Sequence, residues 1–280
     1  MATHEDWESI CHILPIIDKG FMTAGINGHV VIVDDGSVQT EKKDCIRRLK
    51  LTAIQDIELI KLGCNQGNQR AMAIGVGHIA ATRTCDYLVA MDSDNEDSPE
   101  FVGSLLEKCS ASRKPTVVFA KRSKRSEGHL FKILYFFYRM LFQVLTGQTI
   151  MFGNFCAIPG AFIRRFSFLS DLWAHFPASI VRSGVPIDSI PSKRGKRMFG
   201  AGKMNIVKLV IHAFSGFSVY NDYVAARLII LVGFFAIGFI LLFCALLFVK
   251  IFTGHDVLIP GWASLMITLV FLIFTIFLGS

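Results

Sequence analysis

The sequence predicts an α/β domain with a mostly parallel sheet, followed by helices at a membrane surface and a two-helix transmembrane hairpin. Three observations support this prediction. Short β-branched runs alternate with helical segments over roughly the first 120 residues, as expected for strands joined by helical crossovers. Acidic residues crowd directly behind two of the strand segments. Two long uncharged apolar runs follow in the C-terminal part of the sequence.

The predicted elements follow one another in a regular order. The first strand, over 30–33, ends in the sequence DDGS, where Gly36 permits a sharp turn. The next elements are a helix near 41–51, a strand over 57–62, a helix over 69–82 and a strand over 87–91. Ser98 and Pro99 then open another helix, with the serine as its N-cap, before a fourth strand over 116–120.

The stretch MDSDNEDSPE, residues 91–100, places five acids in ten positions behind the third of these strands. Like charges this close repel, so either water solvates them or a cation holds them together. Ligands of an open parallel sheet bind beyond the carboxyl ends of its strands, so both acidic clusters are expected to face one crevice. The carboxylates concerned are those of Asp34, Asp35, Asp92 and Asp94. An oxygen-only group suits Mg²⁺ or Mn²⁺, whereas a solvated turn is the commoner explanation for either cluster alone.

The composition narrows the classes of partner. The net charge of +7 suits a surface beside anionic lipid head groups, and without a nucleic-acid-binding motif no nucleic-acid partner is predicted. No apolar segment of a cleavable signal peptide precedes residue 30. The seven cysteines form no CxxC pair, so they are expected to be reduced thiols, most of them packed in a cytosolic domain.

Two uncharged runs, 228–249 and 257–278, each match the roughly 20 residues that span a bilayer as a helix. The link over 250–256 is short enough to force an antiparallel hairpin, and the alternative is a buried helical pair in a soluble core. Lysine and arginine are concentrated ahead of the first run. The chain is therefore expected to be an integral membrane protein whose large N-terminal part is cytoplasmic.

Two further segments predict helices in the membrane interface. The sequence FKILYFFYRMLFQVL has one polar stripe at spacings of three and four, and residues 205–215 repeat the pattern. A helix packed on the sheet would show a similar stripe, but the neighbouring hairpin favours the interface. The predicted division is an α/β domain over 1–203, an interfacial helix over 204–227 and the hairpin over 228–280.

Six motifs together resemble a known family. In order they are VDDGS, NQGNQRAMAIG, MDSDNEDSPE, AKRSKR, GNF and RMFGAGKM. They resemble the membrane-anchored polyprenyl-phosphate sugar transferases of glycosyltransferase family 2, to which dolichyl-phosphate mannose synthase and the bactoprenyl-phosphate glucosyltransferases belong. The resemblance implies a GT-A fold and an inverting transfer of a sugar from a UDP- or GDP-sugar to a polyprenyl phosphate, with Mg²⁺ or Mn²⁺ as cofactor.

The resemblance also implies roles for particular residues. Asp34 and Asp35 fall on the motif that contacts the nucleotide, and the stretch near the donor contains Asn65, Gly67 and Arg70. Asp92 and Asp94 fall on the DxD pair, with Asp94 the better metal ligand and Glu96 a further one. Arg122 and Arg125 match positions that hold the lipid phosphate, which makes Asp94 and these two arginines the implied catalytic set. The other interpretation of both arginines is a solvated or lipid-facing basic loop.

The chemistry gives each role a physical reason. A divalent cation neutralises the charge that develops on the diphosphate as the sugar leaves. The acceptor is a phosphate monoester with a second pKa near 6, so it is already ionised and needs positioning more than a general base. Arginine supplies that positioning through bidentate, charge-assisted hydrogen bonds.

The sequence departs from the family pattern at three places. The family's first strand is expected to be missing, because the chain begins MATHEDWE, which resembles only the turn behind that strand. Asn154 stands where many relatives have Asp, and Gly202 stands where relatives often have Ser. A non-catalytic or truncated relative that acts as a binding or scaffold subunit is therefore the alternative function. A processive synthase would carry Gln-x-x-Arg-Trp, which is absent. The sequence does not decide between a monomer and a homo-oligomer.

Overall fold

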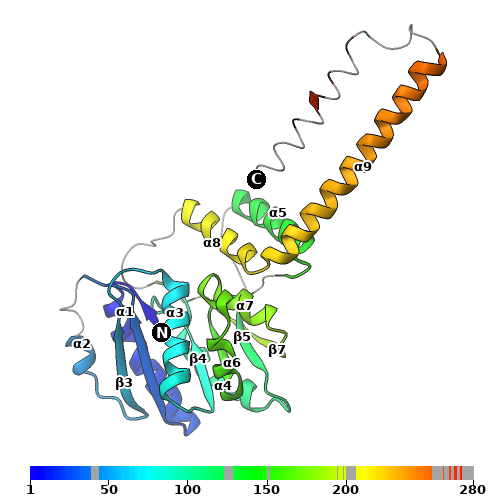
Figure 1. The fold of residues 1–280 in the computed structure, drawn as a ribbon. Helices are drawn as coiled ribbons and strands as arrows, with labels where there is room; N and C mark the ends of the chain where they lie inside the picture. Colours follow the sequence, from blue (N-terminus) through cyan, green and yellow to red (C-terminus); the bar gives the residue numbers. More distant parts are fainter. Residues whose placement is uncertain are drawn as a thin grey trace. The chain divides into compact units, whose positions relative to one another are not determined.

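The computed structural model describes residues 1–38, 44–122, 129–149, 152–193, 195–197, 199, 206–253, 261, 265, 268, 269 and 272. The chain divides into two compact units, Met1–Asn221 and Asp222–Ser280. The first unit is an α/β domain in which helices cover both faces of a sheet (Figure 1). The alternation of strands and helices predicted from the sequence is confirmed by this architecture.

The sheet consists of two hydrogen-bonded groups of strands. The first group has the order β1-β2-β3, with β1 at Ala2–Thr3, β2 at Gly28–Asp34 and β3 at Ile54–Lys61. The second has the order β4-β6-β5-β7, with β4 at Tyr87–Ala90, β5 at Val117–Arg122, β6 at Cys156–Pro159 and β7 at Ile187–Ser192. A parallel bridge between Ala2 and Asp92 joins the two groups. The carboxyl ends of β2 and β4 therefore lie at one edge of a continuous sheet.

The strand β1 corrects the prediction that the first strand is missing. It has only two residues, but it pairs in parallel with β2, with Ala2 opposite Val33 and Thr3 opposite Asp34. The Asp35 amide donates to the Thr3 carbonyl at 2.7 Å, and the Val33 amide donates to the Met1 carbonyl at 2.8 Å. A strand this short has no alternation of apolar and polar residues, so its pattern could not be recognised in the sequence.

The strand β6 is the exception to the parallel arrangement. It runs antiparallel to both β4 and β5, whereas β5 and β7 are parallel. All four of its residues are buried. Neither β6 nor β7 was predicted. The four residues CAIP of β6, next to a helix, give no period that separates strand from helix, and β7, IDSIPS, is mostly polar and contains a proline.

Each face of the sheet has its own apolar core. Along β2, Val30 and Ile32 belong to the core beneath α1 (Trp7–Ala24) and α4 (Val102–Ser110). Val31 and Val33 belong to the core on the opposite face, beneath α3 (Asn68–Thr82), α6 (Gly160–Ser167) and α7 (Phe176–Arg182). This alternation follows from the two-residue period of a strand, and burial on both faces explains the continuous apolar run VVIV.

Several boundaries differ from the sequence prediction. The long helix α1 was not predicted at all. The described part of the helix expected near 41–51 is α2, Asp44–Arg47, and residues 39–43 lie outside the described residues. The helix behind Ser98 begins as the 3₁₀ turn η2 (Pro99–Phe101), and the Ser98 side chain makes no capping hydrogen bond. A second 3₁₀ turn, η3, spans Ser170–Trp173.

Two helices of the first unit pack through aromatic side chains. They are α5 (His129–Thr146) and α8 (Ile206–Ser218). Phe142 is buried against Phe217 and Tyr220, with ring centroids 4.9 Å and 5.7 Å away, and the Tyr138 hydroxyl donates to the Ala213 carbonyl at 3.3 Å. Burial raises the pKa of Tyr138 to about 12, and Tyr135 acts in the same direction, so its hydroxyl stays a donor at neutral pH. The two predicted amphipathic segments are thus helices in contact.

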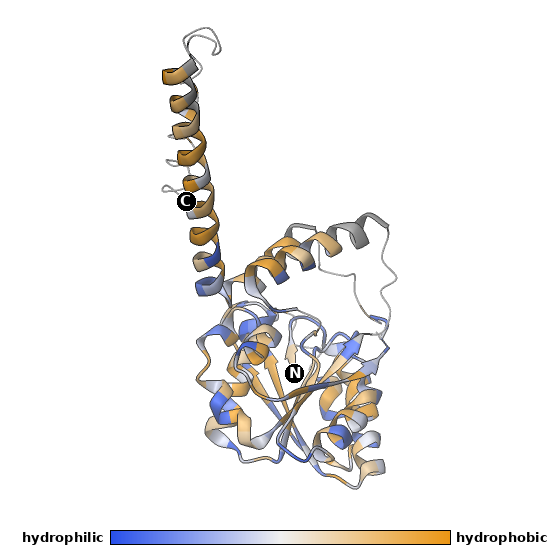
Figure 2. Cartoon of the chain, turned by 90° about the vertical axis from the view of Figure 1, so that its right-hand side faces the viewer, coloured by the Kyte–Doolittle hydropathy of each residue, from blue (hydrophilic) through white to orange (hydrophobic). Residues whose placement is uncertain are grey.

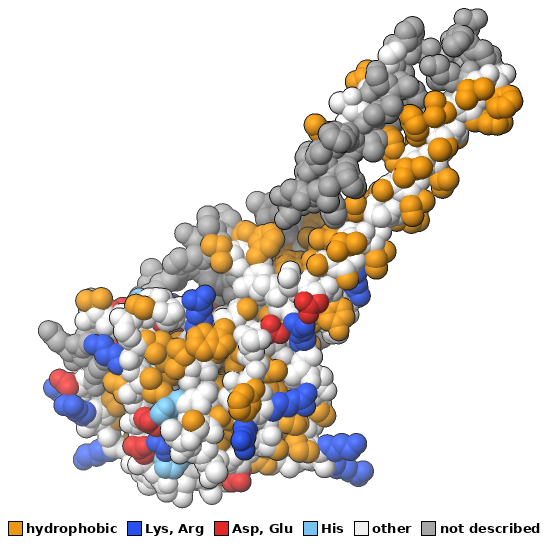
Figure 3. All heavy atoms as spheres, viewed as in Figure 1, with side chains coloured by type: hydrophobic (Ala, Val, Ile, Leu, Met, Phe, Trp, Pro, Cys, Tyr) orange, Lys and Arg blue, Asp and Glu red, His pale blue; other side chains and the backbone are white. Residues whose placement is uncertain are grey.

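The second unit contains most of α9 (Asn221–Thr253). Over Asn221–Ala245 this helix is long and apolar enough to cross a membrane, judged by length and composition alone. Hydrophobic residues run along its described length in Figures 2 and 3. The second predicted span, 257–278, lies almost wholly outside the described residues, so the transmembrane hairpin stays a prediction.

One sequence prediction about the cysteines is wrong. Cys11 of α1 and Cys45 of α2 are joined as a disulfide with a Cα–Cα distance of 6.2 Å. The pairing joins elements that are 34 residues apart in sequence, which spacing alone could not reveal. Cys109 and Cys156 are buried free thiols, as expected, and burial raises the pKa of Cys109 to about 11.

Candidate active site at the carboxyl edge of the sheet

The first acidic cluster is held by backbone amides. Asp34 and Asp35 end β2 and are both buried. One Asp34 carboxylate oxygen accepts the Ser37 amide at 3.0 Å, while Asp35 accepts the amides of Gln66 at 2.6 Å and Gly67 at 2.9 Å. Asp35 therefore holds the loop that leads from β3 into α3.

The glycine of this cluster is required by its surroundings. Gly36 has a φ of +70°, and a Cβ atom there would lie 2.7 Å from the Cys64 carbonyl carbon. A larger residue would be strained by the backbone conformation and would also clash with the loop. The sharp turn predicted at DDGS is confirmed, and its function is to let two loops approach closely.

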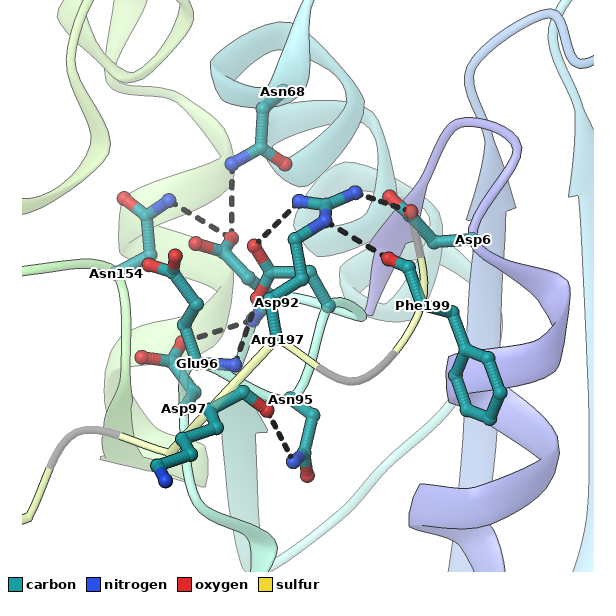
Figure 4. Close-up of polar contacts among 11 residues, drawn as sticks. Asp6, Asn68, Asp92, Asn95, Glu96, Asp97, Asn154, Arg197 and Phe199 are labelled. Atoms are coloured by element: carbon teal, nitrogen blue, oxygen red, sulfur yellow. Dashed lines mark hydrogen bonds and ion pairs between the residues drawn. The ribbon is translucent and has the colours of Figure 1, made fainter. Parts of the chain in front are cut away.

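The second acidic cluster, which we call the acidic loop, spans Asp92–Asp97 behind β4. Side chains hold Asp92 and one oxygen of Asp94, whereas backbone amides of the loop donate to Asp97 and to the other oxygen of Asp94 (Figure 4). Asp92 Oδ1 accepts the side-chain amides of Asn68 at 2.9 Å and Asn154 at 3.1 Å. Within the loop, Asp94 Oδ1 accepts the Glu96 amide at 2.9 Å, and Asn95 takes the left-handed conformation with a φ of 67°. Asparagine tolerates that conformation better than most residues.

A chain of amides behind the acidic loop fixes Asp92. The Phe176 backbone amide donates to Gln69 Oε1 at 2.6 Å, Gln69 Nε2 donates to Asn154 Oδ1 at 3.2 Å, and Asn154 Nδ2 donates to Asp92. In this chain each amide group donates to the next oxygen, and Asp92 is the final acceptor. Sequence reasoning assigned no role to Gln69, although it lies in the family-like motif NQGNQR.

A segment about 100 residues later in the sequence contacts the acidic loop. We call its three residues, Gly195, Lys196 and Arg197, the strap. The Gly195 amide donates to the Glu96 carbonyl at 2.9 Å, and Asn95 Nδ2 donates to the Lys196 carbonyl at 2.9 Å. Arg197 belongs to the family-like motif RMFGAGKM, but sequence reasoning gave it no role.

Arg197 joins two carboxylates from different parts of the chain. Its Nη1 lies 3.1 Å from Asp94 Oδ2, and its Nη2 lies 2.5 Å from Asp6 Oδ1 (Figure 4). Its Nε donates to the Phe199 carbonyl at 3.1 Å. The side chains of Arg197, Asp6 and Asp94 are between 14% and 20% exposed, so these ion pairs are shielded from bulk water. Asp6 is the other site residue that sequence reasoning missed.

The two acidic clusters lie at the same edge of the sheet. Only β1 separates β2 from the start of the acidic loop, because Ala2 bridges to Asp92 and Thr3 pairs with Asp34. Two strand spacings amount to about 10 Å. The structure thus places both clusters at one edge of the sheet, and a cation shared between them stays a prediction.

The environment of Asp94 disfavours its charge. Burial raises the pKa of Asp94 above its usual value, and the carboxylates of Asp92 and Glu96 act in the same direction. The Glu96 amide and the Arg197 guanidinium oppose them. An anionic Asp94 is thus stabilised by a neighbouring cation, and in this structure the cation is Arg197.

The acidic loop has the donor chemistry of a divalent metal site. Asp92, Asp94 and Glu96 offer only oxygen atoms, which Mg²⁺ and Mn²⁺ prefer, and Asp94 already holds a cationic group. Among the described residues, no three or more His, Cys, Asp or Glu side chains converge as a ready-made metal site. The residues fit an ion held by one or two carboxylates, with phosphate oxygens and water supplying its other ligands.

Comparison with known proteins identifies the family. The sequence profile described as "Glycosyl transferase family 2" matches residues 21–173, more than half of the chain. The chain belongs to glycosyltransferase family 2. A curated relative of this glycosyltransferase is the uncharacterized glycosyltransferase YkoT of Bacillus subtilis (strain 168). The two are 24% identical over 255 residues, which cover 87% of this chain and 70% of YkoT.

Solved structures show the fold of this family 2 glycosyltransferase. Mannosyl-3-phosphoglycerate synthase from Rubrobacter xylanophilus is similar with a TM-score of 0.55 and 13% identity, covering 81% of this chain and 72% of that one. The mannosyltransferase PcManGT from Pyrobaculum calidifontis, solved in complex with GDP-Man and Mn²⁺, is similar with a TM-score of 0.40 and 15% identity, covering 80% and 72%. The first likeness supports a GT-A-like α/β fold, and the second is too low to carry an argument.

The remaining predicted site residues lie around the same edge or outside the described residues. Asn65 Oδ1 accepts the Gly67 amide at 3.1 Å, and Gly67, with a φ of +90°, is the N-cap of α3. Arg70 is exposed, and its Nη1 lies 3.5 Å from Gln66 Oε1. Arg122 is the last residue of β5, whereas Arg125 lies outside the described residues. Their roles stay predictions.

Proposed function

We propose that this family 2 glycosyltransferase transfers a sugar, with inversion, from a nucleoside diphosphate sugar to a polyprenyl phosphate at the cytoplasmic face of a membrane. Family membership supplies the transferase activity. The observation that supports a lipid acceptor is an apolar surface on α5 and α8, in the same unit as the acidic loop. The protein is accordingly an integral membrane protein with a cytoplasmic catalytic domain.

The apolar surface consists of large side chains that face solvent. On α5, Phe136, Phe137, Leu141 and Val144 are each more than half exposed, and on α8 the same holds for Ile211 and Phe214. The two helices contact each other through Tyr138 and Phe217, whose ring centroids are 5.8 Å apart. Soluble monomers rarely expose a contiguous surface of this kind, and amphipathic helices in a membrane interface do.

The donor is proposed to lie along the carboxyl edge of the sheet. Asp34, Asp35 and the loop with Asn65 and Gly67 would form the nucleotide side, together with Arg70 in the first turn of α3. The amide-rich start of α3 suits phosphate oxygens, because helix N-termini favour anions. One or two of the carboxylates of Asp92, Asp94 and Glu96 would hold Mg²⁺ or Mn²⁺, which would neutralise the diphosphate as it leaves.

The acceptor side needs orientation and little proton transfer. A phosphate monoester is mostly ionised at neutral pH and can attack the anomeric carbon without losing a proton to the enzyme. Asn154 is consistent with this mechanism, because its amide cannot act as a base and instead donates to Asp92. Arg122 and Arg125 are proposed to bind the acceptor phosphate with bidentate hydrogen bonds.

A transfer assay tests the proposal. The full chain in detergent is incubated with Mg²⁺ or Mn²⁺, polyprenyl phosphate, and radiolabelled UDP-glucose, UDP-N-acetylglucosamine or GDP-mannose in turn. We expect label from one donor to enter the organic phase as an acid-labile lipid, and to stay in water without acceptor or with Asp94→Asn. Label transferred only to a soluble acceptor, or none transferred with any donor, would contradict the lipid-phosphate proposal.

A matched pair of variants tests the apolar surface separately. Phe137→Ser with Leu141→Ser removes two exposed apolar side chains of α5, whereas Arg164→Ser with Ser167→Ala changes one exposed and one half-buried residue of α6, on the globular part of the domain. The α5 pair should lower transfer to polyprenyl phosphate in vesicles and leave nucleotide binding unchanged, and the α6 pair should change neither. Equal transfer by the α5 pair and the wild type would argue against an interfacial role.

A further inference from the structure

The strap places a guanidinium at the point where the donor's cation is expected. Arg197 Nη1 and Asp94 Oδ2 are 3.1 Å apart, and both side chains are mostly buried. Arg197 is also held from behind by Asp6 and by the Phe199 carbonyl. This arrangement offsets part of the negative charge of the acidic loop, whose carboxylates repel one another.

We propose that Arg197 is a positioning residue that serves as the counter-cation of the acidic loop before the donor binds, and leaves Asp94 when a divalent cation arrives. The inference rests on the proposed function, which puts the donor's cation at Asp94. It adds that the resting enzyme occupies this carboxylate with its own side chain. The affinity for the metal is then set by a competition within the protein.

Charge and geometry make the two states exclusive. A divalent ion and a guanidinium repel each other, and the Asp94 oxygen that faces Arg197 cannot hold both in a shielded site. The other Asp94 oxygen accepts the Glu96 amide, so Arg197 occupies the oxygen without a backbone donor. Metal binding therefore has to break the contact between Arg197 and Asp94.

Asp6 gives the displaced side chain a place to remain. Its carboxylate faces Nη2, a different nitrogen from the one that faces Asp94. Arg197 can thus release Asp94 and keep Asp6, which costs less than moving a charged side chain into the protein without a partner. The strap would then loosen from the acidic loop without leaving the domain.

Backbone contacts show that the strap is fitted to the loop. A Cβ atom on Gly195 would lie 1.9 Å from the Asn95 carbonyl oxygen, so only glycine permits this approach. The Gly195 amide and the Lys196 carbonyl each make a hydrogen bond to the loop. A substitution at Gly195 therefore offers a way to lift the strap without changing any charge.

The effect of removing Arg197 on metal affinity distinguishes a structural role for this residue from competition with the metal. If Arg197 only held the acidic loop in its binding conformation, removing it would weaken metal binding. If Arg197 competes with the metal, removing it strengthens metal binding. The sign of the change in affinity distinguishes these alternatives, and it does not depend on turnover.

Mn²⁺ titration followed by electron paramagnetic resonance measures this sign directly. The full chain is titrated without nucleotide, and the signal of free Mn²⁺ gives the dissociation constant. We expect Arg197→Gln to bind Mn²⁺ about tenfold more tightly than the wild type, which corresponds to about 1.4 kcal/mol. Lys196→Gln is the matched control, because it removes the same charge from an exposed side chain of the strap and should change affinity less than about twofold.

A second variant tests the strap without altering charge. Gly195→Ala should also tighten Mn²⁺ binding, because the added methyl group lifts the strap from Asn95. The double variant Gly195→Ala, Arg197→Gln should bind no more tightly than Arg197→Gln alone, since both changes remove one competition. Independent, additive gains would contradict a shared cause.

The outcomes separate this inference from the proposed function. Unchanged or weaker Mn²⁺ binding by Arg197→Gln overturns the inference, and the proposed function survives if the wild type binds Mn²⁺ together with UDP or GDP. Absence of Mn²⁺ binding in every variant, with or without those nucleotides, overturns both. Tighter binding by Arg197→Gln that is lost when Asp94→Asn is added supports both.

Discussion

The two acidic clusters at the edge of the sheet differ in what holds their carboxylates. Asp34 and Asp35 are buried and accept hydrogen bonds from backbone amides of neighbouring loops. Asp92 and Asp94 are less buried, and the side chains of Asn68, Asn154 and Arg197 donate to them, with the Glu96 amide as a further donor to Asp94. Backbone donors are fixed by the fold, whereas side chains can rotate away.

This difference indicates which carboxylates can exchange hydrogen-bond partners more easily. Replacing a backbone donor requires a loop to move, and an unpaired buried amide costs about 1–3 kcal/mol. Replacing a side-chain donor requires a rotation about single bonds. We infer that Asp34 and Asp35 form the frame of the site, and that Asp92 and Asp94 are the carboxylates that change partners when a donor binds.

The comparison is tested most strongly at Asp94. Asp94→Asn should lower kcat/KM by more than about 100-fold, because even indirect changes around metal ligands commonly cost 10–100-fold. The thermal stability of Asp94→Asn should stay within a few degrees of the wild type, since the charge that is removed is one that burial and the neighbouring carboxylates disfavour. Glu100→Gln is the matched control, because Glu100 is an exposed acid of the same stretch. Sugar transfer and thermal unfolding are measured in parallel for both variants. A lower melting temperature of Asp94→Asn with little loss of transfer would show that Asp94 stabilises the fold and does not act in the reaction.

Asp35 should show the reverse behaviour. Asp35→Ala leaves the Gln66 amide without its acceptor and leaves the Gly67 amide with Asn65 Oδ1 alone, and we expect the free energy of unfolding to fall by about 3 kcal/mol. Asp44→Ala removes an exposed acid, whose ion pair with Arg47 is worth little, and should cost less than about 0.5 kcal/mol. Urea unfolding followed by tryptophan fluorescence measures both. If Asp35→Ala lowered the free energy of unfolding no more than Asp44→Ala does, the backbone-held carboxylates would not be the frame of the site.

Asp18 is a further carboxylate held by backbone amides, and it lies outside the candidate active site. Its buried carboxylate accepts the amides of Thr52, Ala53 and Ile54 at 2.8–3.0 Å. Burial opposes its ionisation, but these donors outweigh burial and hold the pKa of Asp18 below its usual value. The carboxylate therefore stabilises the fold above the unfolded-state pKa of about 4. That contribution is lost as the pH falls through the lower native pKa.

The corresponding experiment compares unfolding at several pH values. Asp18→Asn should lower the free energy of unfolding by about 2 kcal/mol between pH 5 and 8. The difference from the wild type should shrink below about pH 4, as the native carboxyl group becomes protonated. A difference that stays constant down to pH 2 would show that the charge of Asp18 is not what the amides stabilise.

The smallest expected effect concerns Asn154. Asn154→Asp replaces a donor to Asp92 with a second carboxylate, and two close carboxylates raise the pKa of one of them. The added group is then stable in its protonated form at low pH, and stability relative to the wild type should fall by about 1 kcal/mol as the pH rises through that raised pKa. Melting temperatures of both proteins from pH 4 to 8 measure this. Parallel profiles would mean that the amide chain does not hold Asp92.

Much of the fold could be predicted because its signals are local. The run VVIV within β2, the small residues of α3 and the acidic stretch behind β4 each show their character within a few residues. The family motifs, taken in order, then indicated the edge of the sheet at which the site lies. Local pattern was sufficient wherever burial on one face, or on both, sets the period.

The parts that could not be predicted depend on contacts distant in sequence. Arg197 and Asp6 are 191 residues apart, and Asn154 meets Asp92 across 62 residues. The strand β1 is too short for a pattern, and its pairing is decided by β2 and the acidic loop. The disulfide partners, 34 residues apart, belong to the same class.

The most direct test of this account is an anomalous diffraction map of crystals that contain Mn²⁺ and the nucleoside diphosphate of the active donor. We expect one manganese peak beside the Asp94 carboxylate. Arg197 should be turned away from Asp94, and the amides of Gln66 and Gly67 should still donate to Asp35. A peak beside Asp34 and Asp35, or an intact contact between Arg197 and Asp94 in the presence of the metal, would contradict it.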